Sequence, residues 1–233
     1  MKSWNTIIKD FSHLFFPHIC PGCGTDILSS NSVLCIRCID NLPVTNFHFH
    51  TGNQVEKIFW GRIPLTYATS LCYFNSGSLI QSLLHQLKYK GNKELGYFLG
   101  RLMGSIMIQS NRFSNIDALI PLPLFPSKEK QRGYNQAAVL CDGMSETMNI
   151  PVLKDIVTRV KSTSTQTKKN RVERWQNIDG KFAVTDLSLL KNQHVLLVDD
   201  VITTGATLEA CGQEILQAEN TRLSIATLAY TIK

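Results

Sequence analysis

The sequence lacks a hydrophobic run long enough to cross a bilayer, and its first residues do not resemble a signal peptide. The N-terminal apolar stretch is interrupted by Lys9, Asp10 and His13, and no small-residue cleavage site follows it. The seven cysteines are an odd number and do not suggest a simple disulfide framework. These absences predict a cytoplasmic protein without a membrane span.

The composition is that of one globular domain with a small addition. With 233 residues and a hydrophobic fraction of 43%, the chain is long enough for one α/β core and a small appendage. The formal net charge of +6 is modest. Such a charge permits phosphate-rich partners but identifies none of them.

The most informative stretch runs from His194 to Leu208 and reads HVLLVDDVITTGATL. Its apolar run at 195–198 is short and rich in β-branched residues, which favours a strand buried on both faces of a parallel sheet. The run is followed directly by two acids, Asp199 and Asp200. A turn of small residues then precedes a helical run, and it consists of Thr203, Thr204, Gly205, Ala206 and Thr207.

This order of residues suits the binding of a sugar phosphate. Backbone N–H groups and the positive end of a helix dipole point at such a turn, where a phosphate can bind, and threonine hydroxyls add further donors. The two carboxylates can accept hydrogen bonds from ribose hydroxyls. An ordinary strand-to-helix turn at the wet edge of a sheet is the alternative. The complete pattern favours a ribose 5-phosphate site.

Four of the cysteines form two CxxC pairs near the N-terminus, and they are Cys20, Cys23, Cys35 and Cys38. Two such pairs at this spacing predict a zinc ribbon with four thiolate ligands, and a redox role is the competing interpretation. Substitution of a cysteine ligand by a nearby histidine stays open, the candidates being His18, His48 and His50. The other cysteines are expected to be packing residues, and they are Cys72, Cys141 and Cys211.

Strand-like and helix-like runs alternate along the rest of the chain. Strands are expected at 65–74, 118–124, 152–160 and 223–232, and helices at 79–90, 94–108 and 136–148. This alternation predicts an α/β fold with a doubly wound, mainly parallel sheet. Residues 1–16 favour an amphipathic helix docked on the body, with a membrane-surface helix as the alternative, and 44–63 are expected to be a connector.

Basic residues gather in three places. The turn between the helices at 79–90 and 94–108 has Lys88, Lys90 and Lys93, which fit a solvated helix end and a phosphate contact equally well. The loop after Pro123 contains three cations suited to a second phosphate group, namely Lys128, Lys130 and Arg132. The polar segment 161–177 predicts a mobile loop that passes into a short helix, with a disordered linker as the alternative.

The stretch 194–208 resembles the 5-phosphoribosyl 1-pyrophosphate (PRPP) motif of type I phosphoribosyltransferases. Over nearly the whole chain after the first helix, the motifs together resemble the ComF family of phosphoribosyltransferase-like proteins. The resemblance rests on the order and spacing of the two CxxC pairs, LKYKGN, IPLPL with QRGYNQ, the segment from Arg159 to Gly180-Lys-Phe, and VLLVDDVITTGATL.

The resemblance implies roles for individual residues. Asp199 and Asp200 would contact the ribose as candidate catalytic residues, and 203–207 would bind the 5-phosphate. The segment 161–174 would be a lid over the ligand. A magnesium ion would be bound together with PRPP. Further substrate contacts would come from the pyrophosphate loop and from two arginines, the residues being Lys128, Lys130, Arg132, Arg159 and Arg174.

Two departures from the usual pattern of the family are visible. The pyrophosphate loop reads SKEKQ where arginine-rich sequence is common, so the cation that meets the pyrophosphate stays open. The helix after the central motif runs into Ala218-Glu219-Asn220, where a glycine often ends it.

The resemblance implies one of two functions. The first is a PRPP-binding protein that handles single-stranded DNA during natural transformation, with a competence helicase or other DNA-processing proteins as candidate partners. The alternative is an active transferase that moves ribose 5-phosphate from PRPP to a nitrogen acceptor and releases pyrophosphate. No glutamine amidotransferase activity is expected, because the chain begins Met1-Lys2-Ser3 without a nucleophilic cysteine. The predicted domains are a helix at 1–16, a zinc ribbon with connector at 17–63, and a phosphoribosyltransferase-like domain at 64–233.

Overall fold

The structure is a computed structural model, and it describes residues 18–26, 32–160 and 181–232. The helix expected at 1–16 lies outside these residues, as does the segment 161–180 with Arg174. In chain order the helices are α2 (Ile36–Asp40), η1 (Phe47–Phe49), α3 (Gln54–Phe59), α4 (Leu79–Tyr89), α5 (Lys93–Met107), η2 (Asn111–Phe113), α6 (Pro126–Arg132), α7 (Gln136–Met148), η3 (Leu187–Leu189) and α9 (Ala206–Ile215). The strands are β1 (Tyr67–Phe74), β2 (Ala118–Pro121), β3 (Val157–Val160), β4 (Lys181–Val184), β5 (His194–Ile202) and β6 (Arg222–Thr231).

Four strands form a parallel sheet in the order β1-β6-β5-β2. The predicted α/β fold with a mainly parallel sheet is confirmed. The central strand β5 is apolar and fully buried at 195–198 because it has a neighbour on each side and helices on both faces. Of the strand expected at 152–160, only the last four residues form β3, which pairs antiparallel with β4 in a separate hairpin.

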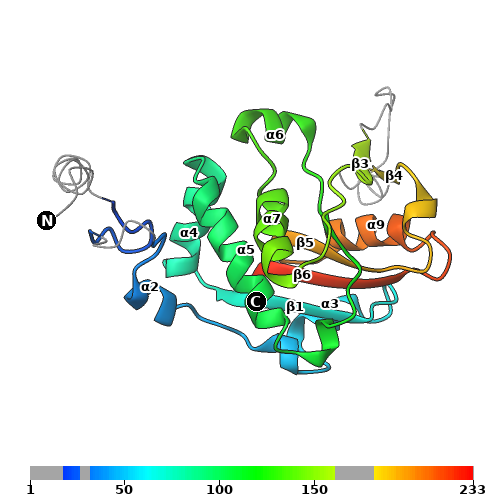
Figure 1. Cartoon of the computed structure of the whole chain (residues 1–233), viewed down its shortest axis with the longest axis horizontal. Helices are drawn as coiled ribbons and strands as arrows, with labels where there is room; N and C mark the ends of the chain where they lie inside the picture. The colour runs from blue at the N-terminus through cyan, green and yellow to red at the C-terminus, as the bar shows by residue number, and fades with distance from the viewer. Residues whose placement is uncertain (1–17, 27–31, 161–180, 233) are drawn as a thin grey trace, which may run out of the picture.

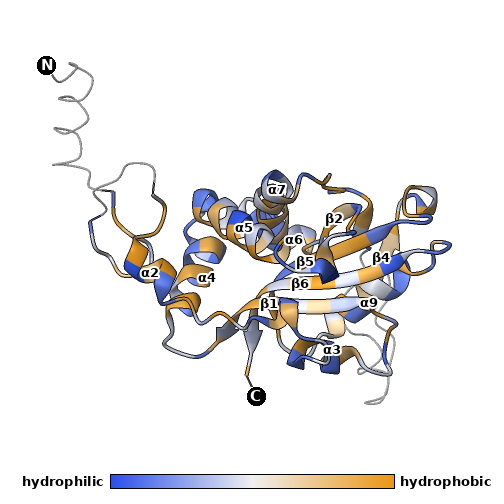
Figure 2. Cartoon of the chain, turned by 60° about the horizontal axis from the view of Figure 1, so that its bottom comes forward, coloured by the Kyte–Doolittle hydropathy of each residue, from blue (hydrophilic) through white to orange (hydrophobic). Residues whose placement is uncertain are grey.

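Helices cover both faces of the sheet, as Figure 2 shows with α4, α5 and α7 on one side and α3 and α9 on the other. The strands are mostly white to orange in that view, whereas the helices also carry hydrophilic residues. Each face has its own hydrophobic cluster, and β5 contributes alternate residues to the two, Leu196 and Val198 to one and Val195 and Leu197 to the other. The hairpin β3–β4 and helix α6 stand at the periphery in Figure 1.

Residues 44–63, expected as a connector, are instead structured and partly buried. They contain η1 and α3, and Val55 and Phe59 are almost completely buried against the sheet. Asn53 caps α3 with its side-chain oxygen and donates its side-chain amide to the carbonyl oxygen of Ala68 in β1 at 2.8 Å. This bond fixes α3 under the sheet.

Within the described part of the chain, no helix is both long and apolar enough to span a membrane. The three cysteines expected to be packing residues are fully buried in the hydrophobic clusters, and they are Cys72, Cys141 and Cys211.

Candidate functional site

The turn after β5 forms a small polar hollow. β5 extends through both acids to Ile202, and the turn then leads into α9, whose N-cap is Gly205 with a φ of +74°. A cavity of about 50 Å³ is lined by Asp199 and by the turn residues 201–208. Asp199 therefore lines the same cavity as the turn that the sequence predicts to bind a phosphate.

The backbone donors of this turn are available to a ligand. Among hydrogen bonds between described residues, the N–H groups of Thr204, Gly205, Thr207 and Leu208 have no acceptor. The N–H of Ala206 donates to a hydroxyl two residues away, Thr204 Oγ1, at 3.5 Å. Because these donors lie at the first turn of a ten-residue helix, they suit an anion such as a phosphate.

Helix α3 forms the back wall of the turn. A Cβ atom at Gly205 would lie 2.7 Å from Cγ2 of Ile58 and 3.0 Å from the ring of Phe59. Arg62 donates to the carbonyl oxygen of Thr204 at 2.8 Å and forms an ion pair with Glu209 in α9. These three supporting residues were missed at the sequence level because nothing in 44–63 has a recognisable motif.

The two acids lie on opposite sides of β5. Asp200 is 9% exposed and forms an ion pair with Lys88 of α4 at 3.0 Å. Asp199 accepts a hydrogen bond from the N–H of Asp200 at 2.7 Å. Burial, followed by the charge of Asp200, raises the pKa of Asp199 to about 8. An acid with a raised pKa, here Asp199, beside a phosphate-sized cavity has the features of a functional site.

Arg159 lies on the same side as Asp199. Its guanidinium carbon is 3.6 Å from the ring centroid of Phe125 and 5.0 Å from that of Phe182, so the side chain is held between β4 and the segment before α6. Its charge lowers the pKa of Asp199 against the larger effect of burial. The structure thus brings Arg159, Asp199 and the turn 203–207 together.

The segment expected to be a pyrophosphate loop is not a loop, because residues 126–132 form helix α6. Pro126 starts this helix at its first position, and Gly133 ends it with a φ of +78°. Lys128 and Lys130 are exposed on it, and neither makes a contact with the acid pair among the described residues. Arg132 points elsewhere, donating to Gln136 Oε1 at 2.7 Å.

The lysines at the α4–α5 turn separate into different environments. Lys88 pairs with Asp200, whereas Lys90 is exposed and Lys93 lies 5.2 Å from the ring of Tyr134. Lys90 fits the solvated helix end, whereas a phosphate contact of Lys88 stays a prediction. The ion pair places Lys88 at the candidate site, and the sequence did not indicate that it would lie beside Asp200.

The four N-terminal cysteines form one cluster. The sulfur atoms of Cys20, Cys23, Cys35 and Cys38 all lie within 4.8 Å of one another, and those of Cys23 and Cys35 are 3.6 Å apart. Tetrahedral zinc with bonds of about 2.3 Å requires sulfur separations of about 3.8 Å, so the cluster fits a metal of this kind. No histidine joins this cluster in the described ranges, and His18 bonds instead to the carbonyl oxygen of Ser32.

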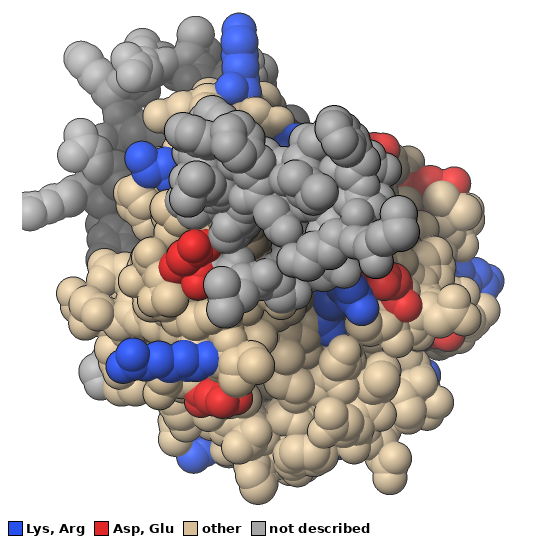
Figure 3. Space-filling model, turned by 60° about the vertical axis from the view of Figure 1, so that its left-hand side comes forward, with Lys and Arg blue, Asp and Glu red and all other residues tan. Residues whose placement is uncertain are grey.

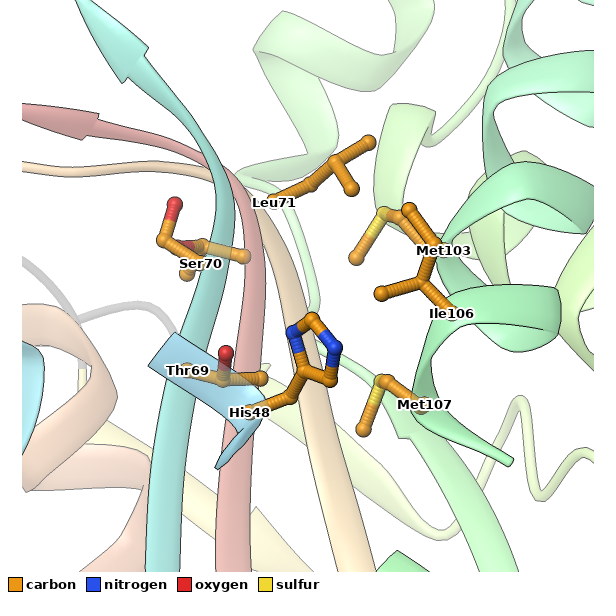
Figure 4. Close-up of a pocket in the computed structure, with 8 residues that line it drawn as sticks. His48, Thr69, Ser70, Leu71, Met103, Ile106 and Met107 are labelled. Atoms are coloured by element: carbon orange, nitrogen blue, oxygen red, sulfur yellow. The ribbon is translucent and has the colours of Figure 1, made fainter. Parts of the chain in front are cut away.

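A second enclosed hollow between β1 and α5 is too small for an organic ligand (Figure 4). Its volume is about 10 Å³, and two polar atoms at its wall, His48 Nε2 and Thr227 Oγ1, have no partner among the described residues. Burial, then the charges of His50 and Arg112, lower the pKa of His48. The volume of this hollow is close to that of a single water molecule.

Charged side chains are dispersed on the side of the molecule where α2 and the cysteine cluster lie (Figure 1 and Figure 3). Figure 3 shows the described lysine and arginine side chains standing apart from one another, several beside acidic ones. No continuous basic patch covers the visible described surface of this face.

Comparison with known proteins agrees with this geometry. The phosphoribosyl transferase domain family matches residues 135–233, which include β5, the turn and α9. Competence protein F of Haemophilus influenzae is 37% identical over 207 residues, covering 84% of this chain and 83% of that protein. The chain belongs to the ComF family.

Two further comparisons found similar proteins. DNA utilization protein YhgH of Escherichia coli K12 is 26% identical to this ComF-family chain over 217 residues, covering 92% of it and 91% of YhgH. Among solved structures, a glutamine PRPP amidotransferase from B. subtilis has a TM-score of 0.41 and 14% identity, covering 61% of this chain and 30% of that one. This chain thus spans under a third of the amidotransferase.

Proposed function

We propose that this ComF-family protein binds PRPP at the turn 203–207 and handles single-stranded DNA during natural transformation. The observation that supports the proposal best is the row of unused backbone donors next to the acid pair. A terminal phosphate would accept hydrogen bonds from the turn, and the ribose hydroxyls would donate to Asp199 and Asp200. The names of two relatives, competence protein F and DNA utilization protein YhgH, support the role in DNA handling.

Two metals belong to this proposal. Zinc would be held by the four cysteine thiolates and would support the fold of the ribbon. Magnesium bound to PRPP oxygens would supply charge neutralisation at the pyrophosphate. Arg159 would add positive charge from this chain at the pyrophosphate, and a contribution of the α6 cations there stays a prediction.

The double substitution Asp199→Asn with Asp200→Asn tests the sugar contacts. Hydrogen bonds to charged acceptors contribute about 1.5–3 kcal/mol each, so the affinity for PRPP with magnesium is expected to fall by about 100-fold or more. Calorimetric titration measures this change. A Glu219→Gln control, which removes a 65% exposed carboxylate at the surface, is expected to bind as the wild type does. Equal PRPP affinity in the double variant and the control would refute the assignment of the acids.

The DNA is proposed to lie outside the ribose pocket. Two adjacent carboxylates disfavour the phosphodiester of a nucleic acid backbone, whereas a free ribose offers hydroxyl donors. Close to the pocket, at the end of α4, Tyr89 is 63% exposed. Its ring lies 5.0 Å from that of His85 and 5.9 Å from the guanidinium carbon of Arg132. An exposed ring flanked by a cation suits base stacking. Tyr134, by contrast, is only 8% exposed and donates its hydroxyl to the Leu87 carbonyl oxygen.

Tyr89→Ala tests this stacking platform. Stacking on an aromatic ring contributes about 1–3 kcal/mol per base, so the affinity for single-stranded DNA is expected to fall about 5- to 150-fold. Fluorescence anisotropy at several salt concentrations measures it. The salt slope should stay unchanged in Tyr89→Ala, whereas Lys130→Ala should reduce it by about 0.7. Tyr97→Ala is the matched control, because Tyr97 is 39% exposed on α5 and bonds to Glu146. DNA affinity equal to that of this control would exclude Tyr89 as the platform.

A transferase is the second candidate function, and one cavity favours it. A hollow of about 340 Å³ lies between the proline-rich segment after β2 and the start of β3, with Arg159 in its wall. This volume falls in the range of small-molecule sites, about 300–1,000 Å³. A nitrogen heterocycle would fit there beside the proposed ribose site. Pyrophosphate release from PRPP across a panel of bases and amines separates turnover from binding without turnover.

A further inference from the structure

Lys88 is part of the candidate site although it lies far from the phosphoribosyl transferase domain match in sequence. The match begins at residue 135, whereas Lys88 is in the last turn of α4. Its Nζ atom is 3.0 Å from Oδ2 of Asp200, and the two side chains are only 22% and 12% exposed. An ion pair this sheltered from solvent is screened less than a surface pair.

The backbone around Lys88 is fixed by packing. Leu83, Leu84 and Leu87 of α4 are buried in the cluster on one face of the sheet. The hydroxyl of Tyr134 donates to the carbonyl oxygen of Leu87, which ties the end of α4 to the start of α7. The fold therefore fixes the backbone position from which Lys88 reaches Asp200.

Two cations among the described residues act on Asp199. Lys88 approaches from α4 and Arg159 from β3, and both lower the pKa of Asp199. From α9, Cys211 interacts electrostatically with Asp199, and burial, followed by the charge of Asp199, raises the pKa of this thiol well above its usual value. Cys211 therefore adds no charge at neutral pH, and Lys88 is the cation that also forms an ion pair with Asp200.

We propose that Lys88 is a positioning residue of the PRPP site, which as the ion-pair partner of Asp200 orients this carboxylate to accept ribose hydroxyls. The inference rests on the proposed PRPP binding and adds that the site is completed by the N-terminal half of the chain. In the free protein Lys88 serves as the counterion of Asp200. When ribose hydroxyls donate to Asp200, the ammonium remains beside the sugar, where the phosphates of PRPP add negative charge that it also offsets.

Lys88→Met, Lys88→Arg and Lys90→Met test this role. Lys90→Met is the matched control, because it removes the same charge from an exposed position two residues away. Calorimetry with PRPP and magnesium near neutral pH is expected to show at least about 10-fold weaker binding for Lys88→Met, and near wild-type affinity for Lys90→Met. Lys88→Arg, which keeps the charge, is expected to recover most of the affinity.

The pH dependence separates this role from a merely structural one. PRPP affinity is expected to rise as the acid pair ionises, because a carboxylate accepts a hydroxyl hydrogen bond better than a carboxylic acid does. An opposite charge this close lowers the pKa of a carboxyl by about 1–3 units. Removing the Lys88 ammonium should therefore shift the pH at which PRPP affinity rises upward by about one unit or more. The difference in PRPP affinity between Lys88→Met and Lys90→Met should become smaller at alkaline pH. A Lys88→Met protein with the affinity and pH profile of Lys90→Met would overturn the proposal.

A ligand-free measurement keeps the inference independent of the proposed function. Carbon-13 NMR of the aspartate carboxyl groups follows the ionisation of the acid pair in the wild type and in both lysine variants. An upward shift in Lys88→Met alone supports the counterion role even if no variant binds PRPP, in which case the proposed function fails by itself. Identical titrations in Lys88→Met and Lys90→Met refute the inference whether or not PRPP binds.

Discussion

Gly205→Ala is expected to abolish PRPP binding and to lower the free energy of unfolding by about 2–5 kcal/mol. About 1–2 kcal/mol comes from forcing an L side chain into the left-handed region, where Gly205 has a φ of +74°. A further 1–3 kcal/mol or so comes from overpacking, because the new Cβ would lie 2.7 Å from Ile58. The strain is relieved only by moving the turn away from α3, which displaces the phosphate donors. Chemical denaturation and PRPP calorimetry measure the two effects.

Gly77→Ala is the matched control for this substitution. Gly77 has the same φ, +74°, but an added Cβ there would meet nothing within 4 Å. The control should lose only the conformational share, about 1–2 kcal/mol, and should bind PRPP as the wild type does. If Gly205→Ala costs no more than Gly77→Ala and keeps its affinity, the close contact with α3 does not determine the geometry of the turn.

The local features of the site could be predicted because each is encoded in consecutive residues. The buried run of β5, the two acids and the small-residue turn stand next to one another in the chain, and the structure has them in that order. The four cysteines are likewise predictable, since a CxxC pair brings two sulfur atoms to one turn whatever surrounds it. The helix was expected to run into 218–220, but α9 already ends at Ile215. Asn220 lies in the turn before β6 and takes the left-handed conformation with a φ of +55°.

The remaining parts of the site could not be predicted because they depend on contacts between distant segments. Arg62 and Thr204 are 142 positions apart, and Lys88 and Asp200 are separated by more than a hundred. No periodicity in 44–63 or 79–90 indicates which side chain will reach the carboxyl edge of β5. The short helix α6 was missed for another reason. Its proline and its glycine, which suggest a loop in isolation, mark the start and the end of a seven-residue helix.

Helix α4 contacts the cysteine cluster at one end and the candidate site at the other. A Cβ at Gly22, within the first CxxC turn, would lie 2.7 Å from Cδ1 of Leu79, which begins α4. The other end of the same helix presents Lys88 to Asp200. Cys20 and Cys38 also belong to the hydrophobic cluster that holds Leu83 and Leu87. The cysteine cluster therefore packs as part of the core, and a loss of metal is expected to affect α4.

Cys23→Ser is expected to remove the bound zinc and to lower the free energy of unfolding by at least about 3 kcal/mol, a part of the roughly 10–16 kcal/mol typical of structural zinc. Cys23 is exposed, so its substitution costs little packing and isolates the loss of a ligand. Metal analysis, denaturation and hydrogen exchange of α4 measure the result, and chelation of the wild type should reproduce it.

Cys72→Ala is the control for this metal prediction, because Cys72 is fully buried in the same cluster but lies outside the group of four sulfurs. It should be destabilised through packing while keeping its zinc and its response to chelator. Hydrogen exchange at the first turn of α4 should increase in Cys23→Ser and stay unchanged in Cys72→Ala, because only the former releases the turn that packs on Leu79. The four thiols do not form a structural metal site if the Cys23→Ser protein retains zinc, or if a chelator leaves the free energy of unfolding of the wild type unchanged.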